Sequence, residues 1–433
     1  MLSQAENDLL TQVGAGTPAG NLFRRYWHPV ALSRELPDGA GPLAVRLLGE
    51  DLTLFRDELG RLGLLGLHCS HRRSDLSYGR IEDGGLRCLY HGWLYDVHGR
   101  ILETPAEPES STLKDKIEHP AYPCHEVGGV IFAYMGPGNP PLFPAYDCWN
   151  APPEFLHATK FYNDCNYLQG LEGSLDSSHL SYLHQFLPKP DPANPKRAPA
   201  GRAITGSSLS GRSLMALDGT PRLETEETSW GMLMYQVREA PAADGVEMQY
   251  VGITNFLYPF IVCIVGGAID DGDYTLNWHT PIDDTHQLEF DISFSRSRPL
   301  DKEAIEEGFR KEFGPDFRFI RNPSNRWLQD REEMRTSTFS GIGSAFAVHD
   351  NFATVSEGPI MDRTQEHLGY GDVVALAGRR LLLRAIRDIQ EGNEAPGVIR
   401  DPAANRFPGM GAYKEVIPAA ESLESVWKKH VRV

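Results

Sequence analysis

The stretch Cys69-Ser-His71, followed after 16 residues by Cys88-Leu-Tyr-His91, decides how the first part of this chain is expected to fold. It offers two thiolates and two imidazoles, because each short loop contributes one cysteine and one histidine. Beyond it, a turn at His98-Gly99 separates two strand-like segments, residues 94–96 and 100–102. Short strands punctuated by glycine turns are typical of a small β-domain. The sequence therefore predicts a β-domain that presents two metal-binding loops.

The order of the ligands on these loops distinguishes between two kinds of metal site. A Rieske [2Fe–2S] cluster holds one iron by two cysteines and the other by two histidines. A zinc site with the same ligand types usually pairs cysteine with cysteine and histidine with histidine along the chain. The mixed pairs favour the cluster over zinc, and Tyr90 and Trp93 are expected to shield it. The expected cluster ligands are Cys69, His71, Cys88 and His91.

Composition limits the class of protein. The chain has 433 residues, more than one domain usually holds, and its apolar fraction of 41% supports real cores. A net charge of −17 argues against nucleic acid as a partner. Residues 1–8 lack the basic and apolar parts of a signal peptide, and apolar runs such as residues 130–135 are too short to span a bilayer. These features predict a soluble, cytoplasmic protein with no membrane partner.

Proline-rich segments indicate how the chain is divided. Strand-like residues 45–48, 52–55 and 128–134 precede a proline-rich run at residues 136–144, which is the best domain boundary in the sequence. A second such run, residues 188–199, is expected to be an excursion within one domain. The expected parts are an N-terminal lead over residues 1–40 that packs on a catalytic domain, a Rieske domain over residues 41–144, and the catalytic domain over residues 145–433.

A second candidate metal site lies in residues 166–184. Leucines recur there at helical spacing, and Asp176 and His179, three residues apart, share one helix face. His179 and His184 are five residues apart and would lie about 140° from each other around an ideal helix. Both can point at one metal only if the helix ends or bulges between them. Two imidazoles and one carboxylate form the facial triad of a non-haem Fe(II) oxygenase, which leaves positions open for dioxygen.

The third ligand of such a triad must come from elsewhere in the chain. Asp330, Asp350 and Asp362 are the candidates, and spacing alone does not choose among them. Asp176 itself is better placed to accept a hydrogen bond from the other ring nitrogen of His179 and so to fix its tautomer.

The second half of the chain indicates an antiparallel sheet and a long helix. Apolar and polar residues alternate in strand-like fashion in residues 224–238, 247–256, 274–281 and 287–294. Gly371-Asp372 then opens a helix of period near 3.6 over residues 373–389. The arginines on this helix are interpreted as a solvated face: Arg379, Arg380, Arg384 and Arg387.

Together these motifs resemble the oxygenase (α) component of Rieske non-haem iron oxygenases, in the phthalate 4,5-dioxygenase-like branch that also holds aromatic O-demethylases. The resemblance covers nearly the whole length, including residues 26–29, both cluster loops, residues 172–184 and residues 357–368. It implies an α+β fold, with an all-β Rieske [2Fe–2S] domain and a helix-grip (START-like) catalytic domain built on an antiparallel sheet. It also implies a mononuclear non-haem Fe(II) held by His179, His184 and Asp350.

The resemblance further implies how electrons travel. In the family a head-to-tail homotrimer brings His91 of one subunit close to Asp176 of the next, so Asp176 corresponds to the inter-subunit bridge. A separate NAD(P)H-dependent reductase, with or without a ferredoxin, supplies the electrons, since this chain has no flavin or dinucleotide motif. In relatives that oxidise aromatic acids, arginines clamp the carboxylate. The candidates here are Arg202, Arg212 and Arg238.

Two departures from the family pattern lie near the expected ligands. Many relatives have Cys-Pro-His-Arg-Gly in the first loop, whereas this chain has Cys69-Ser-His-Arg-Arg73, which changes loop stiffness and local charge. Before Asp350 the branch often has glutamine, and this chain has His349. For His349 a position at the surface or behind the ligands is favoured over direct ligation.

The expected function is that of the oxygenase component of a multicomponent Rieske oxygenase. It would use O₂ and NAD(P)H-derived electrons to monooxygenate, O-demethylate or hydroxylate a carboxylated aromatic compound of the lignin or phthalate type. One alternative is cis-dihydroxylation of an aromatic ring at the same site. A second alternative, of another class, is a Rieske electron carrier fused to a ligand-binding domain without catalytic iron.

Overall fold

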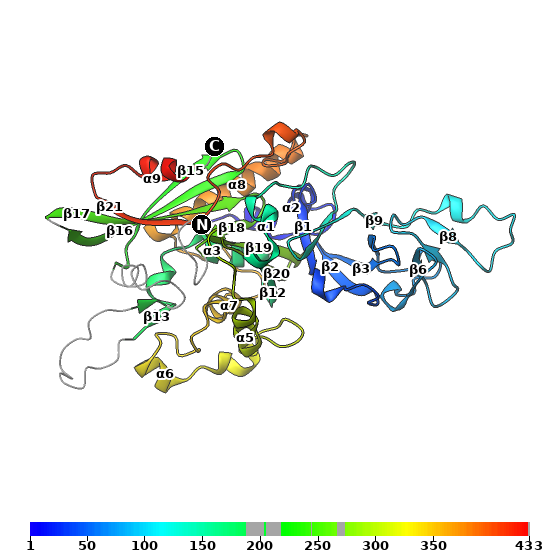
Figure 1. Cartoon of the computed structure of the whole chain (residues 1–433), viewed down its shortest axis with the longest axis horizontal. Helices are drawn as coiled ribbons and strands as arrows, with labels where there is room; N and C mark the ends of the chain where they lie inside the picture. The colour runs from blue at the N-terminus through cyan, green and yellow to red at the C-terminus, as the bar shows by residue number, and fades with distance from the viewer. Residues whose placement is uncertain (188–202, 205–217, 244, 266–272, 432–433) are drawn as a thin grey trace.

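The computed structural model describes residues 1–187, 203–204, 218–243, 245–265 and 273–431. The molecule is elongated, with the strands near the cluster loops at one end of the long axis and the large sheet with its helices towards the other (Figure 1). Within these residues no helix is both long and apolar enough to cross a membrane.

Two small antiparallel sheets form the part that carries the cluster loops. The first sheet has the order β2 (Leu43–Leu47), β3 (Glu50–Arg56), β4 (Leu62–Gly66) and β9 (Ala121–Tyr122). The second has the order β5 (Arg80–Glu82), β6 (Gly85–Arg87), β7 (Leu94–Tyr95) and β8 (Ile101–Glu103). One cluster loop follows β4 and the other connects β6 to β7. A separate apolar cluster packs beside them and includes Phe55, Leu86, Trp93 and Tyr95.

A third sheet connects this part to the rest of the molecule. Its central strand is β11 (Val130–Tyr134), flanked by β1 (Trp27–Leu32) and β10 (Cys124–Val127). The predicted strand within residues 128–134 is confirmed as β11, and every residue of β11 is buried. Phe132 packs against Trp278 of the large sheet, with ring centroids 5.2 Å apart. One apolar core therefore continues from the third sheet into the large sheet.

The large antiparallel sheet has the order β12 (Leu156–Asn163), β20 (His286–Phe294), β19 (Tyr274–Asp283), β18 (Ile261–Ile264), β17 (Val246–Leu257), β16 (Gly231–Ala243) and β15 (Arg222–Thr228). β21 (Tyr413–Pro418) also pairs with β17, and β13 (Gln185–Phe186) pairs separately with β14 (Ala203–Ile204). Because side chains alternate along a strand, β19 and β20 have one apolar face in the core and one polar face. The predicted strands over residues 247–256, 274–281 and 287–294 are confirmed as β17, β19 and β20.

The prediction of a single strand over residues 224–238 is wrong, because this segment forms the hairpin of β15 and β16. The chain turns between Thr228 and Gly231, where Gly231 has a φ of 153°. A Cβ at this position would lie 2.0 Å from the carbonyl oxygen of Phe256, so the close approach of β17 requires glycine. In the sequence the turn coincides with a change from the polar residues 224–229 to the apolar residues 232–235.

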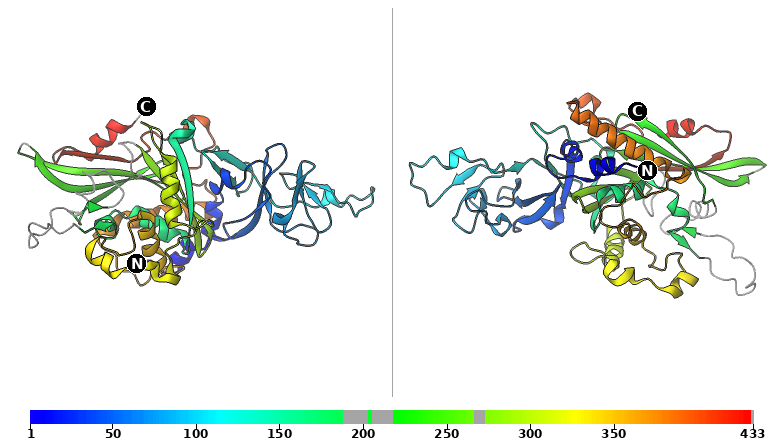
Figure 2. Two further views of the ribbon diagram at one scale, coloured as in Figure 1. Left: turned by 60° about the horizontal axis from the view of Figure 1, so that its bottom comes forward. Right: turned by 180° about the vertical axis from the view of Figure 1, so that it is seen from behind.

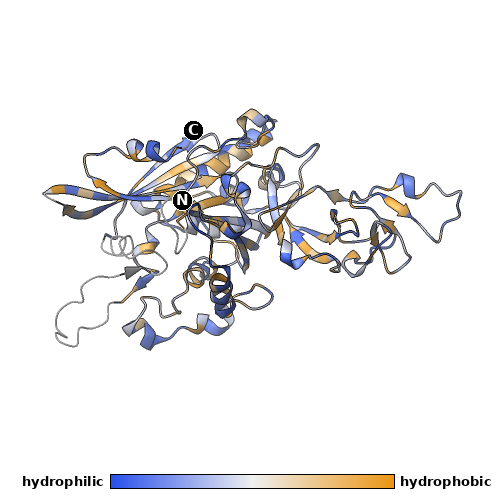
Figure 3. Ribbon diagram, in the orientation of Figure 1, coloured by the Kyte–Doolittle hydropathy of each residue, from blue (hydrophilic) through white to orange (hydrophobic). Residues whose placement is uncertain are grey.

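Helices cover the large sheet and extend beside it. α8 (Val373–Gln390), the predicted long helix, packs against β15, α1 (Gln4–Thr11), α2 (Pro18–Phe23) and α3 (Tyr167–Leu175), and Figure 2 shows it from behind. Further helices are α5 (Lys302–Glu312), α6 (Arg331–Thr336), α7 (Phe346–Ser356) and α9 (Leu423–His430). Apolar residues concentrate on the large sheet and α8, whereas α5 and α6 are largely hydrophilic (Figure 3). The predicted α+β class, with a helix-grip part on an antiparallel sheet, is confirmed.

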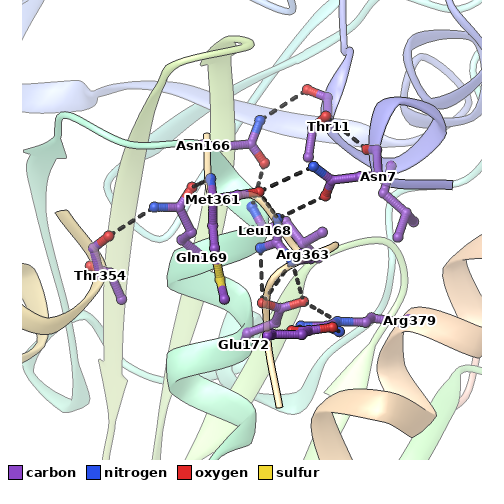
Figure 4. Close-up of polar contacts among 12 residues, drawn as sticks. Asn7, Thr11, Asn166, Leu168, Gln169, Glu172, Thr354, Met361, Arg363 and Arg379 are labelled. Atoms are coloured by element: carbon purple, nitrogen blue, oxygen red, sulfur yellow. Dashed lines mark hydrogen bonds and ion pairs between the residues drawn. The ribbon is translucent and has the colours of Figure 1, made fainter. Parts of the chain in front are cut away.

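Buried ion pairs anchor α3, the helix that leads into the second candidate metal site. Glu172 accepts hydrogen bonds from Arg363 at 2.8 Å and from Arg379 at 2.5 Å (Figure 4). Arg379 also binds both carboxylate oxygens of Glu366, at 2.5 and 2.9 Å. The interpretation of Arg379 as part of a solvated face is therefore wrong, because carboxylates from distant segments hold it inside. The other three arginines of that face are exposed: Arg380, Arg384 and Arg387.

The N-terminal helix joins the same network. The Asn7 amide donates to the carbonyl of Met361 at 3.1 Å and accepts from Arg363 at 3.2 Å (Figure 4). At the N-cap of α3, the Asn166 amide donates to the carbonyl of Thr11 at 2.9 Å, and on the helix Gln169 accepts the Met361 N–H at 3.0 Å. α3 is thus fixed by the N-terminal helix and by residues 361–379, and the residues that follow it start from a defined position.

Candidate metal centres

The two cluster loops share one backbone geometry. The N–H of the fourth residue after each cysteine donates to that cysteine's carbonyl, from Arg73 to Cys69 at 2.9 Å and from Gly92 to Cys88 at 3.1 Å. Both closing residues have a left-handed φ, 63° at Arg73 and 72° at Gly92. Glycine adopts this conformation freely, whereas another residue loses about 1–2 kcal/mol. The first loop therefore carries an arginine where its backbone favours the glycine of many relatives.

The four predicted cluster ligands differ in how deeply they are buried. The two cysteines are buried and the two histidines reach the surface. The rings of His71 and His91 lie with centroids 4.4 Å apart, and Trp93 stacks on His71 at 4.8 Å. Trp93 thus covers the site, whereas Tyr90 lies against His91 and is itself 57% exposed. This arrangement fits a [2Fe–2S] cluster with its cysteine side inside and its histidine side at the surface.

A buried tyrosine that the sequence reasoning missed contacts the cluster site. The hydroxyl of Tyr95 lies 3.0 Å from Sγ of Cys69 and accepts the N–H of Ser70 at 3.1 Å. Burial raises the pKa of Tyr95, so the hydroxyl keeps its proton, and it would donate to the Cys69 sulfur when that sulfur is an iron-bound thiolate. Burial also raises the pKa of the Cys69 thiol, so a bound iron is needed to stabilise the thiolate. The proline of many relatives at position 70 has no N–H to offer Tyr95.

α3 ends at Leu175, directly before the second group of candidate ligands. Asp176 caps the helix, and its Oδ1 accepts the N–H of Ser178 at 2.6 Å, which turns the chain. A 3₁₀ turn, η6 (His179–Ser181), follows. The helix is interrupted as the metal-site hypothesis requires, but it ends before His179 rather than between His179 and His184.

The structure brings His179 and His184 together with Asp350 of α7. The Nε2 atoms of the two histidines lie 3.1 Å apart, and Oδ1 of Asp350 lies 3.4 Å from Nε2 of His179 and 3.0 Å from Nε2 of His184. Three donors at about 2.1 Å from one metal, on neighbouring corners of an octahedron, lie about 3.0 Å from one another. The three side chains therefore fit a facial triad around one divalent ion.

The charges of this group favour a cation. Burial lowers the pKa of His179, but the carboxylates of Asp176 and Asp350 outweigh burial and raise that pKa to about 10. Burial raises the pKa of Asp350, and the two histidines outweigh it and hold the pKa well below its usual range. Burial lowers the pKa of His184, which favours the neutral ring that metals bind. The two carboxylates therefore make this site favourable for positive charge, which a bound divalent ion would supply.

The two other carboxylates considered as a third ligand serve different purposes. Asp330 caps α6 by accepting from the backbone N–H of Glu332, and Asp362 accepts from the backbone N–H of Thr364. Within the described part of the chain, neither belongs to the group formed by the two histidines and Asp350.

One further side chain stands behind each histidine. Oδ2 of Asp176 lies 3.4 Å from Nδ1 of His179, which is the contact expected for a residue that orients a ligand. Nδ1 of His349 lies 3.2 Å from Nδ1 of His184, and His349 is fully buried. His349 therefore lies behind the candidate ligands and not at the surface.

Of the three arginines suggested as substrate ligands, only Arg238 lies within the described residues; Arg202 and Arg212 fall outside them. Arg238 is buried and donates to the carbonyl of Ser177 at 2.9 Å and to the hydroxyl of Ser181 at 3.1 Å. These bonds brace the loop that carries His179. Nε of Arg238 and Oγ of Ser177 are buried and have no hydrogen-bond partner among the described residues.

Comparison with known proteins agrees with this geometry. Residues 26–123 match the Rieske [2Fe-2S] domain, and residues 133–431 match the LigXa C-terminal domain like family. The chain is 37% identical to the phthalate 4,5-dioxygenase oxygenase subunit of Pseudomonas putida, over 92% of this chain and 89% of that protein. It is 33% identical to the 5,5'-dehydrodivanillate O-demethylase oxygenase subunit of Sphingobium sp. (strain NBRC 103272 / SYK-6), over 94% and 85% respectively.

Among solved structures, the NdmA QL mutant of Pseudomonas putida CBB5 with caffeine matches with a TM-score of 0.56 and 21% identity, over 88% of this chain and 96% of that one. This likeness shows the fold. The two family matches follow each other along the chain in the order of the two candidate metal centres. The chain therefore belongs to the Rieske non-haem iron oxygenases as an oxygenase (α) subunit, an oxidoreductase whose cofactors are a Rieske [2Fe–2S] cluster and a mononuclear iron.

Proposed function

We propose that this chain uses O₂ and NAD(P)H-derived electrons to monooxygenate or O-demethylate a carboxylated aromatic compound. The observation that carries the proposal is the meeting of two imidazoles and one carboxylate at metal-binding distances, in a chain that also has Rieske loops. An electron carrier fused to a binding domain has no need of such a group. The proposed cluster ligands are Cys69, His71, Cys88 and His91, and the proposed iron ligands are His179, His184 and Asp350.

The protein residues hold and orient the reacting groups. A bound iron supplies the activation of dioxygen. His179, His184 and Asp350 would cover one side of the ion and contribute one negative charge, which leaves the other side open for dioxygen beside the substrate. Phe346 stacks on His184 with ring centroids 3.5 Å apart, so that ring is shielded from water.

A carboxylated aromatic substrate is supported by relatives and by two side chains of this protein. The relatives named above are a phthalate dioxygenase and a dehydrodivanillate O-demethylase. In this chain, Nε of Arg238 on β16 and Oγ of Ser177 on the loop before His179 are buried, have no hydrogen-bond partner among the described residues, and can donate to a carboxylate. Arg202 and Arg212 are proposed as further contacts. Ring cis-dihydroxylation is the second candidate reaction, favoured by the identity of 37% to the dioxygenase subunit.

Electrons are proposed to cross a subunit boundary in a head-to-tail homotrimer. Within one chain, the strands that flank the cluster loops lie far along the long axis from α7, which carries Asp350 (Figure 1). The histidine side of the cluster site is exposed beside Leu89 and Tyr90, and Asp176 keeps 30% of its side chain exposed. Asp176 would therefore bridge a neighbour's cluster to His179.

The remaining parts of the proposal concern the division of the chain and its partners. Residues 1–40 would form a lead on the catalytic domain, residues 41–144 the Rieske domain, and residues 145–433 the catalytic domain. A separate NAD(P)H-dependent reductase, with or without a ferredoxin, would deliver electrons in the cytoplasm.

The direct test is turnover of a panel of aromatic acids, with and without methoxy groups, by the purified protein and a surrogate reductase. O-demethylation consumes one O₂ and one NADH per methyl group and releases formaldehyde, a phenol and water. Cis-dihydroxylation instead places two ¹⁸O atoms from ¹⁸O₂ in the product, so mass spectrometry separates the two reactions. Absence of coupled NADH and O₂ consumption with every member of the panel contradicts the proposal.

The bridge is tested by Asp176→Asn. We expect the cluster spectrum and the iron content to remain and turnover to fall by about 10–100-fold or more, because the contact with His179 loses its charge. Asp362→Asn is the matched control, since Asp362 is bound to its own turn. Full turnover by Asp176→Asn contradicts the bridge.

A further inference from the structure

Two neighbouring side chains, Phe346 and His349, contact the His184 ring. This ring stacks on Phe346, with centroids 3.5 Å apart and planes within 1°. Its Nδ1 atom faces Nδ1 of His349 at 3.2 Å, and both histidines are fully buried. Two ring nitrogens at this distance share one hydrogen, so one of them donates and the other accepts.

The backbone decides which nitrogen donates. Nε2 of His349 lies 2.9 Å from the carbonyl oxygen of Gly343, which can only accept, so Nε2 carries a hydrogen. Among the described residues, the hydrogen-bonding neighbours of the His349 ring nitrogens are this carbonyl, the Ser340 hydroxyl at 3.3 Å and His184, and none of these is a carboxylate that would stabilise a cation. A buried cation without such a partner is costly, so the His349 ring is neutral and its Nδ1 accepts.

The direction of this hydrogen bond determines which nitrogen of His184 has its lone pair free for the metal. Nδ1 of His184 must carry the hydrogen that His349 accepts, and the neutral His184 ring then has its lone pair on Nε2. That Nε2 is the atom that faces Asp350 at 3.0 Å and His179 at 3.1 Å.

We propose that His349 is a positioning residue, which relays hydrogen bonding from the Gly343 carbonyl to His184 and so presents Nε2 of His184 to the mononuclear metal. The inference rests on the proposed metal site. His179 differs, because a carboxylate, Asp176, stands behind it at 3.4 Å. His179 would thus have a charged partner, Asp176, and His184 a neutral partner, His349. A glutamine at position 349, as in many members of the branch, offers one acceptor and one donor and can serve the same relay.

The test measures Co(II) binding to the full-length protein after the mononuclear iron has been removed by chelation, with the cluster spectrum as proof of folding. His349→Met fills the space of the ring with an apolar side chain of adaptable shape and removes both hydrogen-bonding nitrogens. We expect this variant to bind Co(II) about 10–100-fold more weakly than the unsubstituted protein. His349→Gln restores one donor and one acceptor, and we expect its Kd to stay close to that of the unsubstituted protein. Ser340→Ala is the matched control, since it removes the neighbour at 3.3 Å and leaves the Gly343 carbonyl in place.

A second measurement detects the hydrogen on Nδ1 of His184 by proton NMR. In the Co(II) protein, the N–H of each coordinated imidazole gives a paramagnetically shifted proton resonance that disappears as the proton exchanges with D₂O. We expect a slowly exchanging resonance for His184 in the unsubstituted protein and in His349→Gln, and its loss or fast exchange in His349→Met.

The proposal is overturned if His349→Met keeps both the Co(II) affinity and the slow resonance, or if His349→Gln loses them as fully as His349→Met. Weakening by Ser340→Ala to the level of His349→Met also overturns it, because disturbed packing would then explain the result. If the unsubstituted protein and Asp350→Ala bind Co(II) alike, the proposed metal site itself fails, which is a different outcome.

Discussion

The hydrogen bond from Tyr95 to the cluster site leads to a quantitative prediction. The Tyr95 hydroxyl lies 3.0 Å from Sγ of Cys69 and is polarised by the Ser70 N–H at 3.1 Å. Tyr95→Phe removes only this hydroxyl, because the ring of Tyr95 is fully buried and its packing is retained. The sulfur then keeps its iron but loses a hydrogen-bond donor.

The sign and size of the effect follow from charge. The reduced cluster is one unit more negative than the oxidised one, so its sulfurs accept a stronger hydrogen bond. If that bond favours the reduced state by about 1–2 kcal/mol, its loss lowers the reduction potential by about 40–85 mV, at about 59 mV per 1.4 kcal/mol for one electron. The cluster of Tyr95→Phe should therefore be harder to reduce, and electron delivery to the iron should become easier.

The assay is a redox titration of the cluster, followed by its Rieske-type EPR signal. Tyr90→Phe is the matched control, since Tyr90 is 57% exposed and lies against His91 rather than a sulfur. An unchanged potential in Tyr95→Phe, or an equal shift in Tyr90→Phe, refutes the reasoning.

Three further predictions concern the second metal site and the fold. Asp350→Ala should reduce iron from about three to about two per chain and keep the cluster EPR signal; metal analysis that still finds three contradicts the triad. Arg379→Met leaves the buried Glu366 carboxylate unpaired and Glu172 with Arg363 alone, and should lower the free energy of unfolding by about 3–5 kcal/mol in urea titrations, against about 0.5 kcal/mol or less for exposed Arg380→Met. Arg73→Gly relieves a φ of 63° and should raise the free energy of unfolding by up to about 1 kcal/mol, whereas a loss of stability contradicts that interpretation.

The candidate metal centres could be predicted from sequence where their ligands are close neighbours in the chain. Cys69 and His71 are two residues apart, and their types and order alone indicate the cluster. Asp350 lies 166 residues after His184, so its spacing did not distinguish it from Asp330 and Asp362 as the third ligand. The fold places it beside the two histidines. Only the family resemblance pointed to it beforehand.

Residues whose roles depend on partners far away in the sequence were harder to predict from the sequence. Tyr95 stands in an ordinary strand pattern, and its contact with Cys69 depends on how β7 packs against the first cluster loop. Arg379 has the periodicity of an exposed arginine, and it is buried because Glu172 and Glu366 from other segments neutralise it. His349 is adjacent to Asp350 in sequence, yet its contact with His184 is visible only in the fold.

The central claim is that each chain holds a two-iron cluster and a separate single iron. Iron and zinc analysis of the purified protein, combined with EPR of the dithionite-reduced sample, tests it most directly. The account predicts about three irons per chain and a Rieske-type signal from the reduced cluster. Zinc in place of iron, or a reduced sample without that signal, contradicts it.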